Sequence, residues 1–384
     1  MTVKNNNVIV RKHSLLDSSS KLEHLHTFRN MPVSNGCTTN SKSDDIVMNQ
    51  IWDICKNTGL VQLRELAPLD LVYKFPHNDG VGNTWENHDM ELCNFIDEMN
   101  PKKVFEVGAG SGRLGKLYLS KNTANHWTAL EPNHDYDEVV MPNFVHLREW
   151  FDSTYVIHKH YDAIIHSHVL EHSYDPISFL KTIHDQIDND TLHIFSIPNL
   201  FHWVQNKFTN ALHFEHTVFL TEELVDNILK TIGFEILKKH YHDELPCIFY
   251  VTKKSEPKKV TYSKSIYQEN KKVFLDYVAG QLDDVKKLNT KISKFDGEIF
   301  LFGGHIWTQF LISNGLNMSK IKCILDNSPM KQGKRLYGTS LKVKSPKILK
   351  GRERVAVIVM VAQYSKEIKD DIYNNINNKV IFWD

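Results

Sequence analysis

Long apolar runs are missing from this chain of 384 residues, and no stretch approaches the length of a membrane-spanning helix. The first residues, MTVKNNN, lack the apolar core of a signal peptide. Lys plus Arg and Asp plus Glu number 46 each, so the formal net charge is zero and no basic stripe stands out. We therefore expect a cytoplasmic protein that binds neither a membrane nor nucleic acid.

Cysteine is also scarce, and none of it is arranged in the CxxC spacing that is typical of zinc and redox sites. The five cysteines are Cys37, Cys55, Cys93, Cys247 and Cys323. We expect them to stay reduced. His24 and His26 are isolated, and isolated histidines are more often surface or helix residues than ligands, so the sequence predicts no metal site.

Apolar residues make up 41% and charged residues 24% of the chain, which is enough for two or three domains with their own cores. We expect a small N-terminal domain over 1–88, a central α/β domain over 89–255 and a C-terminal α/β domain over 256–384. The polar stretch 253–259 separates the last two. In the C-terminal part, a long charged helix over 263–293 precedes strands at 299–302, 321–325, 355–361 and 380–383.

The most informative stretch is 104–115, VFEVGAGSGRLG, in which a short apolar strand leads directly into Gly108, Gly110 and Gly112. Glycines let the backbone turn sharply and approach a ligand beside the start of a helix. A GxGxG spacing preceded by Glu106 favours S-adenosylmethionine (SAM) over a dinucleotide, which requires GxGxxG. The alternative is a Rossmann-like domain whose loop binds nothing.

The residues after this loop repeat the pattern of a strand followed by a polar turn. A strand at 126–130 ends in Glu131, about 20 residues after the loop, where a carboxylate holds a ribose. The stretch 144–152 offers a short strand with Asp152 and aromatic residues suited to an adenine, and in 161–172 a fourth strand opens into a loop and a helix. We count Glu131, Asp152 and His168 with Glu106 and the glycines as cofactor-binding residues, on a parallel sheet that collects ligands at its carboxyl edge.

Together these parts resemble the nucleotide-sugar C-methyltransferase family. The resemblance spans nearly the whole chain and includes CTT at 37–39, WDIC at 52–55, the glycine loop, and FGGHIWTQFL and LDNSPMKQGKRLYGT at 302–311 and 325–339. It implies a small N-terminal domain of zinc-binding type, a class I SAM-dependent methyltransferase domain and a Rossmann-like C-terminal domain. The CxxC pairs of the family are replaced here, around 13–17 and at 55–58, so we expect no zinc in the N-terminal part.

The segment 213–217, HFEHT, carries the candidate catalytic pair. The resemblance places Glu215 and His216 on a Glu-His pair in which the histidine is the general base. His213 falls where the family tends to have tyrosine, and we treat it as a substrate-binding candidate. Alternate side chains of an extended segment share a face, so His213 and Glu215 would point together. The alternative is a polar pair at a helix entrance, capped by Thr221.

Further site residues come from the same resemblance. His172, in SHVLEH at 167–172, corresponds to an active-site histidine that could hold a ketone oxygen, while His168 and Glu171 could instead be surface and cap groups. Tyr73 and His77 would reach the sugar from the N-terminal part, or pack at a domain junction. Lys331 could meet a diphosphate, although a solvated basic loop is the alternative.

Carbon is a poor nucleophile until a proton beside a carbonyl is removed, which a histidine with a near-neutral pKa can do. The resemblance therefore implies C-methylation of a nucleotide-linked deoxy or keto sugar, with His216 as the base. The same residues would serve an O-methyltransferase, and a scaffold with a vestigial SAM pocket is a third alternative. The turn at 303–305 lacks a third glycine, so a second cofactor is not expected. The nucleotide, the sugar and the oligomeric state stay open.

Overall fold

The computed structural model describes residues 8–74, 82–132 and 141–384. The chain forms two compact units. The central unit comprises Pro76–Trp203 and Glu215–Ser263, and the terminal unit comprises Met1–Phe75, Val204–Phe214 and Lys264–Asp384. The division into three domains stays a prediction, while in the structure the first 75 residues lie in the same unit as the C-terminal part.

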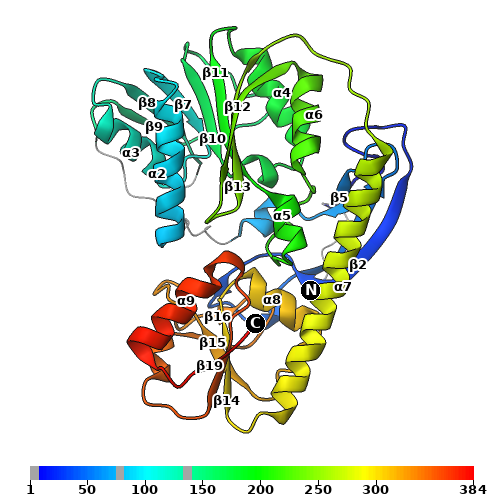
Figure 1. The fold of residues 1–384 in the computed structure, drawn as a ribbon, viewed down its shortest axis with the longest axis vertical. Helices are drawn as coiled ribbons and strands as arrows, with labels where there is room; N and C mark the ends of the chain where they lie inside the picture. The colour runs from blue at the N-terminus through cyan, green and yellow to red at the C-terminus, as the bar shows by residue number, and fades with distance from the viewer. Residues whose placement is uncertain (1–7, 75–81, 133–140) are drawn as a thin grey trace. The chain divides into compact units, whose positions relative to one another are not determined.

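The central unit is built on a seven-stranded sheet in the order β12-β13-β11-β10-β7-β8-β9 (Figure 1). All its strands run parallel except β13, which is antiparallel to both neighbours. The strands are β7 (Lys103–Val107), β8 (His126–Leu130), β9 (Phe144–Leu147), β10 (Ala163–Ser167), β11 (Leu192–Pro198), β12 (Phe234–His242) and β13 (Cys247–Lys254). The expected α/β architecture with a parallel sheet is confirmed.

Helices cover both faces of this sheet (Figure 1). They are α2 (Asn83–Asp97), α3 (Arg113–Lys121), α4 (Pro176–Gln186), α5 (Leu200–Gln205) and α6 (Glu222–Ile232). Leu92 of α2 and Leu119 of α3 are fully buried in one core cluster with Trp127 of β8. Val104, Phe105 and Val107 are buried in β7, the continuous apolar run of a strand covered on both faces.

The strand order reverses at β7, and this reversal positions the candidate site. From β7 the chain proceeds outward to β8 and β9, then crosses back to β10 on the other side. In open parallel sheets, ligands bind beyond the carboxyl ends of the strands at such a switch point. The loops after β7, β8 and β10 therefore lie at the same edge of the sheet.

The terminal unit contains a second parallel sheet, in the order β17-β15-β14-β18-β19. Its strands are β14 (Glu298–Phe302), β15 (Ile321–Leu325), β17 (Val343–Lys344), β18 (Val355–Ile358) and β19 (Ile381–Trp383). Its helices are α7 (Lys264–Lys294), α8 (Ile306–Ser313) and α9 (Ser365–Asp371). The α/β character expected for the C-terminal part is thus confirmed.

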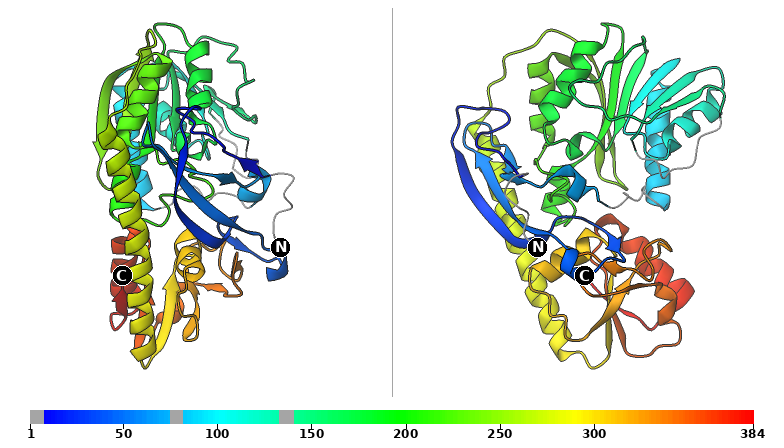
Figure 2. Two further views of the ribbon diagram at one scale, coloured as in Figure 1. Left: turned by 90° about the vertical axis from the view of Figure 1, so that its right-hand side faces the viewer. Right: turned by 180° about the vertical axis from the view of Figure 1, so that it is seen from behind.

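The N-terminal segment adds small antiparallel sheets to the terminal unit. The main one has the order β2-β4-β5, and β1 pairs with β6. Their bounds are β1 (Ile9–Val10), β2 (Leu22–Pro32), β4 (Val47–Cys55), β5 (Val61–Leu63) and β6 (Glu65–Leu66), followed by α1 (Leu69–Val72). β2 and α7 lie side by side in the views of Figures 1 and 2. The Tyr267 hydroxyl donates to Glu23 at 2.6 Å across this contact.

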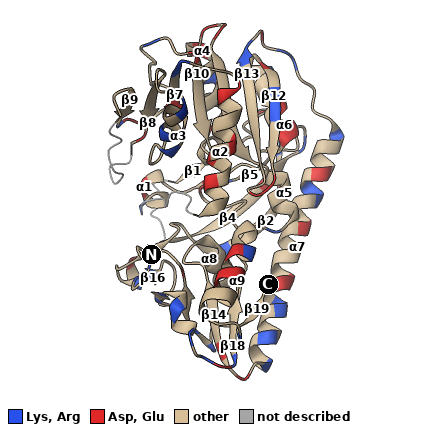
Figure 3. Cartoon of the chain, turned by 60° about the vertical axis from the view of Figure 1, so that its left-hand side comes forward, with Lys and Arg blue, Asp and Glu red and all other residues tan. Residues whose placement is uncertain are grey.

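Helix α7 carries interspersed positive and negative side chains along its length (Figure 3). Lys272 pairs with Asp276 and Lys287 with Asp283, one helical turn apart. Such exposed pairs contribute little to stability, because solvent screens their charges. None of the helices in the described ranges combines the length and the apolar character that crossing a bilayer requires.

The switch point of the second sheet is filled by protein. Strand β3 (Cys37–Thr38) pairs with β16 (Arg335–Leu336), and the Cys37 thiol donates to the Gly304 carbonyl at 3.3 Å. The Gly304 amide donates to Asp326 Oδ2 at 2.8 Å. Burial raises the pKa of Cys37 to about 12, so it stays a thiol. A nucleotide at this edge would have to displace these contacts.

An ion pair fastens the N-terminal segment to the C-terminal sheet within the terminal unit. The Arg335 guanidinium donates to both oxygens of Asp45, at 2.6 and 2.7 Å, and to the carbonyl of Asn40. Only 11% of the Arg335 side chain and 5% of the Asp45 side chain are exposed. This contact gives the RLYGT motif a structural role, because the guanidinium of Arg335 binds the turn that contains Asp45 and holds it in place.

We expect Arg335→Ala to destabilise the protein by about 3 kcal/mol or more, because the buried Asp45 carboxylate would lose its partner. Urea unfolding followed by circular dichroism measures this loss. Arg354→Ala is the matched control, since that arginine pairs with Asp296 in an exposed position. Equal unfolding midpoints for the two variants would contradict the assignment.

Candidate active site of the central unit

The glycine loop lies between β7 and α3, and its backbone needs glycine. Gly108, Gly110 and Gly112 have φ values of 71°, 51° and 70°, in the left-handed region that other residues rarely adopt. A Cβ on Gly108 would lie 2.5 Å from a methyl group of Val169. The loop therefore places backbone without bulky side chains next to the start of α3, a geometry suited to close approach by a ligand.

Glu131 lies directly after β8, beside this loop. Its Oε2 accepts a hydrogen bond from the Gly110 amide at 3.0 Å. The structure thus brings together the glycine loop and the acid that the sequence spacing assigned to the same ligand. A carboxylate at this place can accept from the hydroxyl groups of a ribose.

Glu106 is buried beneath the loop, with 2% of its surface exposed. The Trp127 indole donates to its Oε2 at 2.8 Å. Burial raises the pKa of Glu106 to about 8, against the effect of the Trp127 hydrogen bond and with a further contribution from Asp89 and Glu131. At neutral pH this side chain is therefore mostly a neutral acid that supports the loop from the core.

Asp152 lies in an exposed turn after β9. Its Oδ1 accepts from the amide and the hydroxyl of Thr154, at 2.8 and 2.7 Å, and these bonds lower its pKa. The hydrogen bonds of this carboxylate therefore run within its own turn. A role for Asp152 in cofactor binding stays a prediction.

Four residues from two distant segments lie together and are candidates for catalysis: Glu171, His172, Glu215 and His216, here named the catalytic cluster for their proposed role. Glu171 and His172 lie in a short 3-10 turn after β10, and the other two precede α6. His172 Nδ1 is 3.7 Å from Glu215 Oε2, and the rings of His172 and His216 are 4.7 Å apart, edge to face. The side chains of Glu171, Glu215 and His216 are buried.

Glu171 gives the cluster its negative charge. Burial alone would raise the pKa of this carboxyl, but the hydrogen bond from His168 Nδ1 at 3.0 Å and the charges of His168, His172 and His216 outweigh it. The pKa of Glu171 is therefore held below its ordinary value. Sequence reasoning considered Glu171 only as a possible cap, although its place one residue before His172 was a usable signal.

The structure places three other candidates in the terminal unit. Tyr73 is half-buried after α1, and His213 is buried with its Nδ1 3.4 Å from the Asn35 amide nitrogen. Lys331 is paired with Asp326, with its Nζ 3.1 Å from Oδ2. His77 lies outside the described residues.

The comparisons agree with the fold of this unit. Residues 84–239 match the family model described as a methyltransferase domain. Residues 84–239 of the central unit are therefore similar to a methyltransferase domain. Comparison with curated proteins finds no match.

Several solved methyltransferases are similar to this one over less than half of the chain. One SAM-dependent methyltransferase from Listeria monocytogenes is 14% identical over 44% of this chain and 100% of its own, with a TM-score of 0.36. The plantazolicin methyltransferase BpumL, solved with S-adenosylhomocysteine, is 10% identical over 44% of this chain and 84% of its own (TM-score 0.35). The mitomycin 7-O-methyltransferase MmcR is 14% identical over 44% of this chain and 54% of its own, with a TM-score of 0.37.

SAM is the methyl donor that a methyltransferase domain with this glycine loop is expected to use. The residues present fit it, because Glu131 lies at the end of the neighbouring strand with its carboxylate against the glycine loop. The glycine loop and Glu131 would hold the nucleoside part. When bound, SAM supplies an electrophilic methyl group.

The raised pKa of Glu106 predicts a pH-dependent stability. Between its ordinary value of 4.5 and about 8, the folded state keeps a proton that the unfolded state loses. The stabilising contribution of the acid form is thus present below pH 4.5 and is lost as the pH rises to 8. We expect Glu106→Gln to remove this slope and to be more stable than the wild type at pH 8 by on the order of 2–4 kcal/mol.

Urea unfolding of the ligand-free protein between pH 5 and pH 8.5 measures this difference. Glu149→Gln, at an exposed position of the same unit, is the control and should leave the slope unchanged. Parallel stability curves for wild type and Glu106→Gln would show that the carboxyl is not perturbed.

Glu131 provides a test of the cofactor site. We expect Glu131→Ala to weaken SAM binding by about 10-fold or more, a loss of about 1.4 kcal/mol, because an acceptor for the ribose disappears. The SAM affinity of Glu131→Gln should fall between those of the wild type and Glu131→Ala, since the amide oxygen of the glutamine still accepts a hydrogen bond from Gly110. Calorimetric titration with SAM measures both, with Glu149→Ala as the control. Wild-type affinity in Glu131→Ala would rule out this role.

Proposed function

We propose that this methyltransferase transfers a methyl group to a carbon atom of a nucleotide-linked keto sugar. The observation that carries the proposal is the catalytic cluster, which gathers two carboxylates and two imidazoles after β10 and before α6. The central unit thus provides a base and charge-stabilising groups together with the cofactor loop. Methylation at carbon needs such groups, because the C–H bond beside the carbonyl must be broken first.

His216 is the general base in this proposal. Its ring is buried, with 7% exposed, next to the ring of His172. After it accepts a proton, the imidazolium is stabilised by the neighbouring Glu171 carboxylate. The proton thus moves from the substrate carbon to a nitrogen of His216.

His172 is the proposed partner of the substrate oxygen. Glu215 lies 3.7 Å from its Nδ1 and orients the ring, which leaves the other nitrogen to face the carbonyl. A donor at this oxygen stabilises the negative charge that forms when the adjacent carbon loses its proton. About 29% of the His172 side chain is exposed, so a substrate can reach it.

The remaining candidates are proposed substrate contacts: Tyr73 as a donor to the sugar, His213 as a sugar contact, and His77, which lies outside the described residues, as a further sugar contact. Lys331 is the proposed contact to the diphosphate. Its ion pair with Asp326 would have to open for this role. The nucleotide-sugar family resemblance supports these four assignments.

Solvent exchange separates carbon methylation from the alternative, methylation of a hydroxyl group by the same base. Without SAM, in D2O, we expect the protein to incorporate deuterium beside the carbonyl of a nucleotide-linked 4-keto sugar, detected by NMR. With SAM, the product should carry its methyl group on that carbon. We expect His216→Gln to reduce both reactions by about 10²- to 10⁴-fold.

The control is His126→Gln, an exposed histidine at the amino end of β8, away from the carboxyl edge of the sheet. It should leave exchange and methyl transfer unchanged. A methyl group on oxygen without any deuterium exchange would replace this proposal with O-methylation. Unchanged exchange in His216→Gln would remove His216 as the base.

A further inference from the structure

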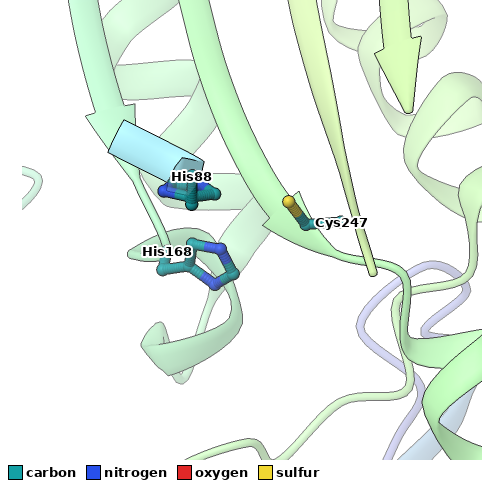
Figure 4. A group of neighbouring side chains, drawn as sticks. All are labelled: His88, His168 and Cys247. Carbon is teal, nitrogen blue, oxygen red and sulfur yellow. The ribbon is translucent and has the colours of Figure 1, made fainter. Parts of the chain in front are cut away.

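A second cluster of histidines in the central unit lies apart from the proposed base and includes a cysteine. It consists of His88 of α2, His168 directly after β10, and Cys247, the first residue of β13 (Figure 4). Because β13 is antiparallel, its first residue pairs with Pro198, at the carboxyl edge of the sheet where His168 also lies. One ligand atom from each residue lies within 4.8 Å of the other two.

Both histidines of this cluster are oriented by carboxylates. His88 Nδ1 is 3.0 Å from Asp89 Oδ1, and His168 Nδ1 is 3.0 Å from Glu171 Oε1. Asp89 also pairs with Arg113, so it is held as a carboxylate that only accepts hydrogen bonds. The proton of each imidazole is therefore on Nδ1, and each Nε2 presents a lone pair.

These two Nε2 atoms have no hydrogen-bond partner among the described residues, although both are buried. His88 is 0% and Cys247 is 1% exposed. The sulfur of Cys247 points toward the two rings in Figure 4. Buried polar atoms are nearly always satisfied, so two unpartnered lone pairs beside one thiol require an explanation.

We propose that His88 Nε2, His168 Nε2 and Cys247 Sγ bind a divalent transition-metal ion, with zinc as the ion that fits best. Imidazole and thiolate are preferred ligands of Zn²⁺, and a carboxylate on the far nitrogen of each histidine is the usual outer partner of a zinc ligand. The three residues leave a fourth position open. This inference departs from the metal-free chain that the missing CxxC pairs predicted.

The geometry requires a modest contraction on binding. At Zn–N and Zn–S lengths of about 2.0–2.3 Å, tetrahedral ligand atoms are about 3.5 Å apart, against a limit of 4.8 Å here. The ligands come from a helix, a turn and a strand end, so side-chain rotation can bring them together. Binding also displaces the Cys247 proton, which passes to solvent as the Zn–S bond forms.

The ion would hold the turn that carries part of the catalytic cluster. His168 begins the segment that continues to Glu171 and His172, and its Nδ1 bond to Glu171 links the two clusters directly. Its φ of 52° is unusual for a residue with a side chain, so its place in the turn is fixed by tertiary contacts. The proposal does not depend on the substrate or on the type of methylation.

The test uses the full-length chain, purified without chelators, and measures its zinc content by elemental analysis. After metal removal, Zn²⁺ is titrated against a chromophoric chelator, and Co²⁺ is added separately as a spectroscopic probe. We expect one zinc per chain and a thiolate-to-cobalt charge-transfer band. Cys247→Ala should abolish the band and weaken zinc binding by about 100-fold or more, beyond the 10- to 100-fold cost of losing an outer partner.

The matched control is Cys93→Ala, which removes another buried cysteine of the same unit and should keep the band and the affinity. His168→Asn provides a second variant, because asparagine tolerates positive φ and leaves the turn intact. Circular dichroism checks the fold of each variant. No bound zinc and no charge-transfer band in the wild type would overturn the proposal, as would a band that persists in Cys247→Ala. SAM binding, measured in the same samples, is independent of either result.

Discussion

The close contact between Gly108 and Val169 is the constraint on which the proposed site depends. It places the loop after β7 against the turn after β10, with no room for a side chain on the glycine. The cofactor loop, with Glu131 bonded to Gly110, therefore lies next to the segment that carries His168, Glu171 and His172. The parallel sheet supplies this proximity, because the two strands are neighbours at the switch point.

Buried carboxylates organise the chemistry around that contact. Glu171 accepts from His168 and stabilises positive charge on His172 and His216, so one acid connects the proposed metal cluster with the proposed catalytic cluster. Glu106 behaves in the opposite way, since burial with a single indole donor raises its pKa. The difference follows from the neighbours, because histidines lie around Glu171 whereas the acids Asp89 and Glu131 lie near Glu106.

The second parallel sheet has the same strand reversal but a different use of its switch point. There the Cys37 thiol and the Asp326 carboxylate are hydrogen-bonded to the backbone of Gly304, and Arg335 binds Asp45 beside this contact. Motif residues that suggested a phosphate site are thus engaged in holding the N-terminal segment. Fold alone does not fix function, because a strand reversal that is suited to a ligand in one unit holds a piece of the protein's own chain in the other.

The sequence by itself determined the strands, the glycine loop and the acid after β8, because apolar periodicity and backbone freedom are local properties. It also indicated Glu215 and His216 by resemblance. Only the tertiary structure decided that Glu171 joins them, that Lys331 is paired with Asp326, and that His88, His168 and Cys247 converge. These residues lie on separate elements, and their distances are set by strand order and packing, which no local pattern contains.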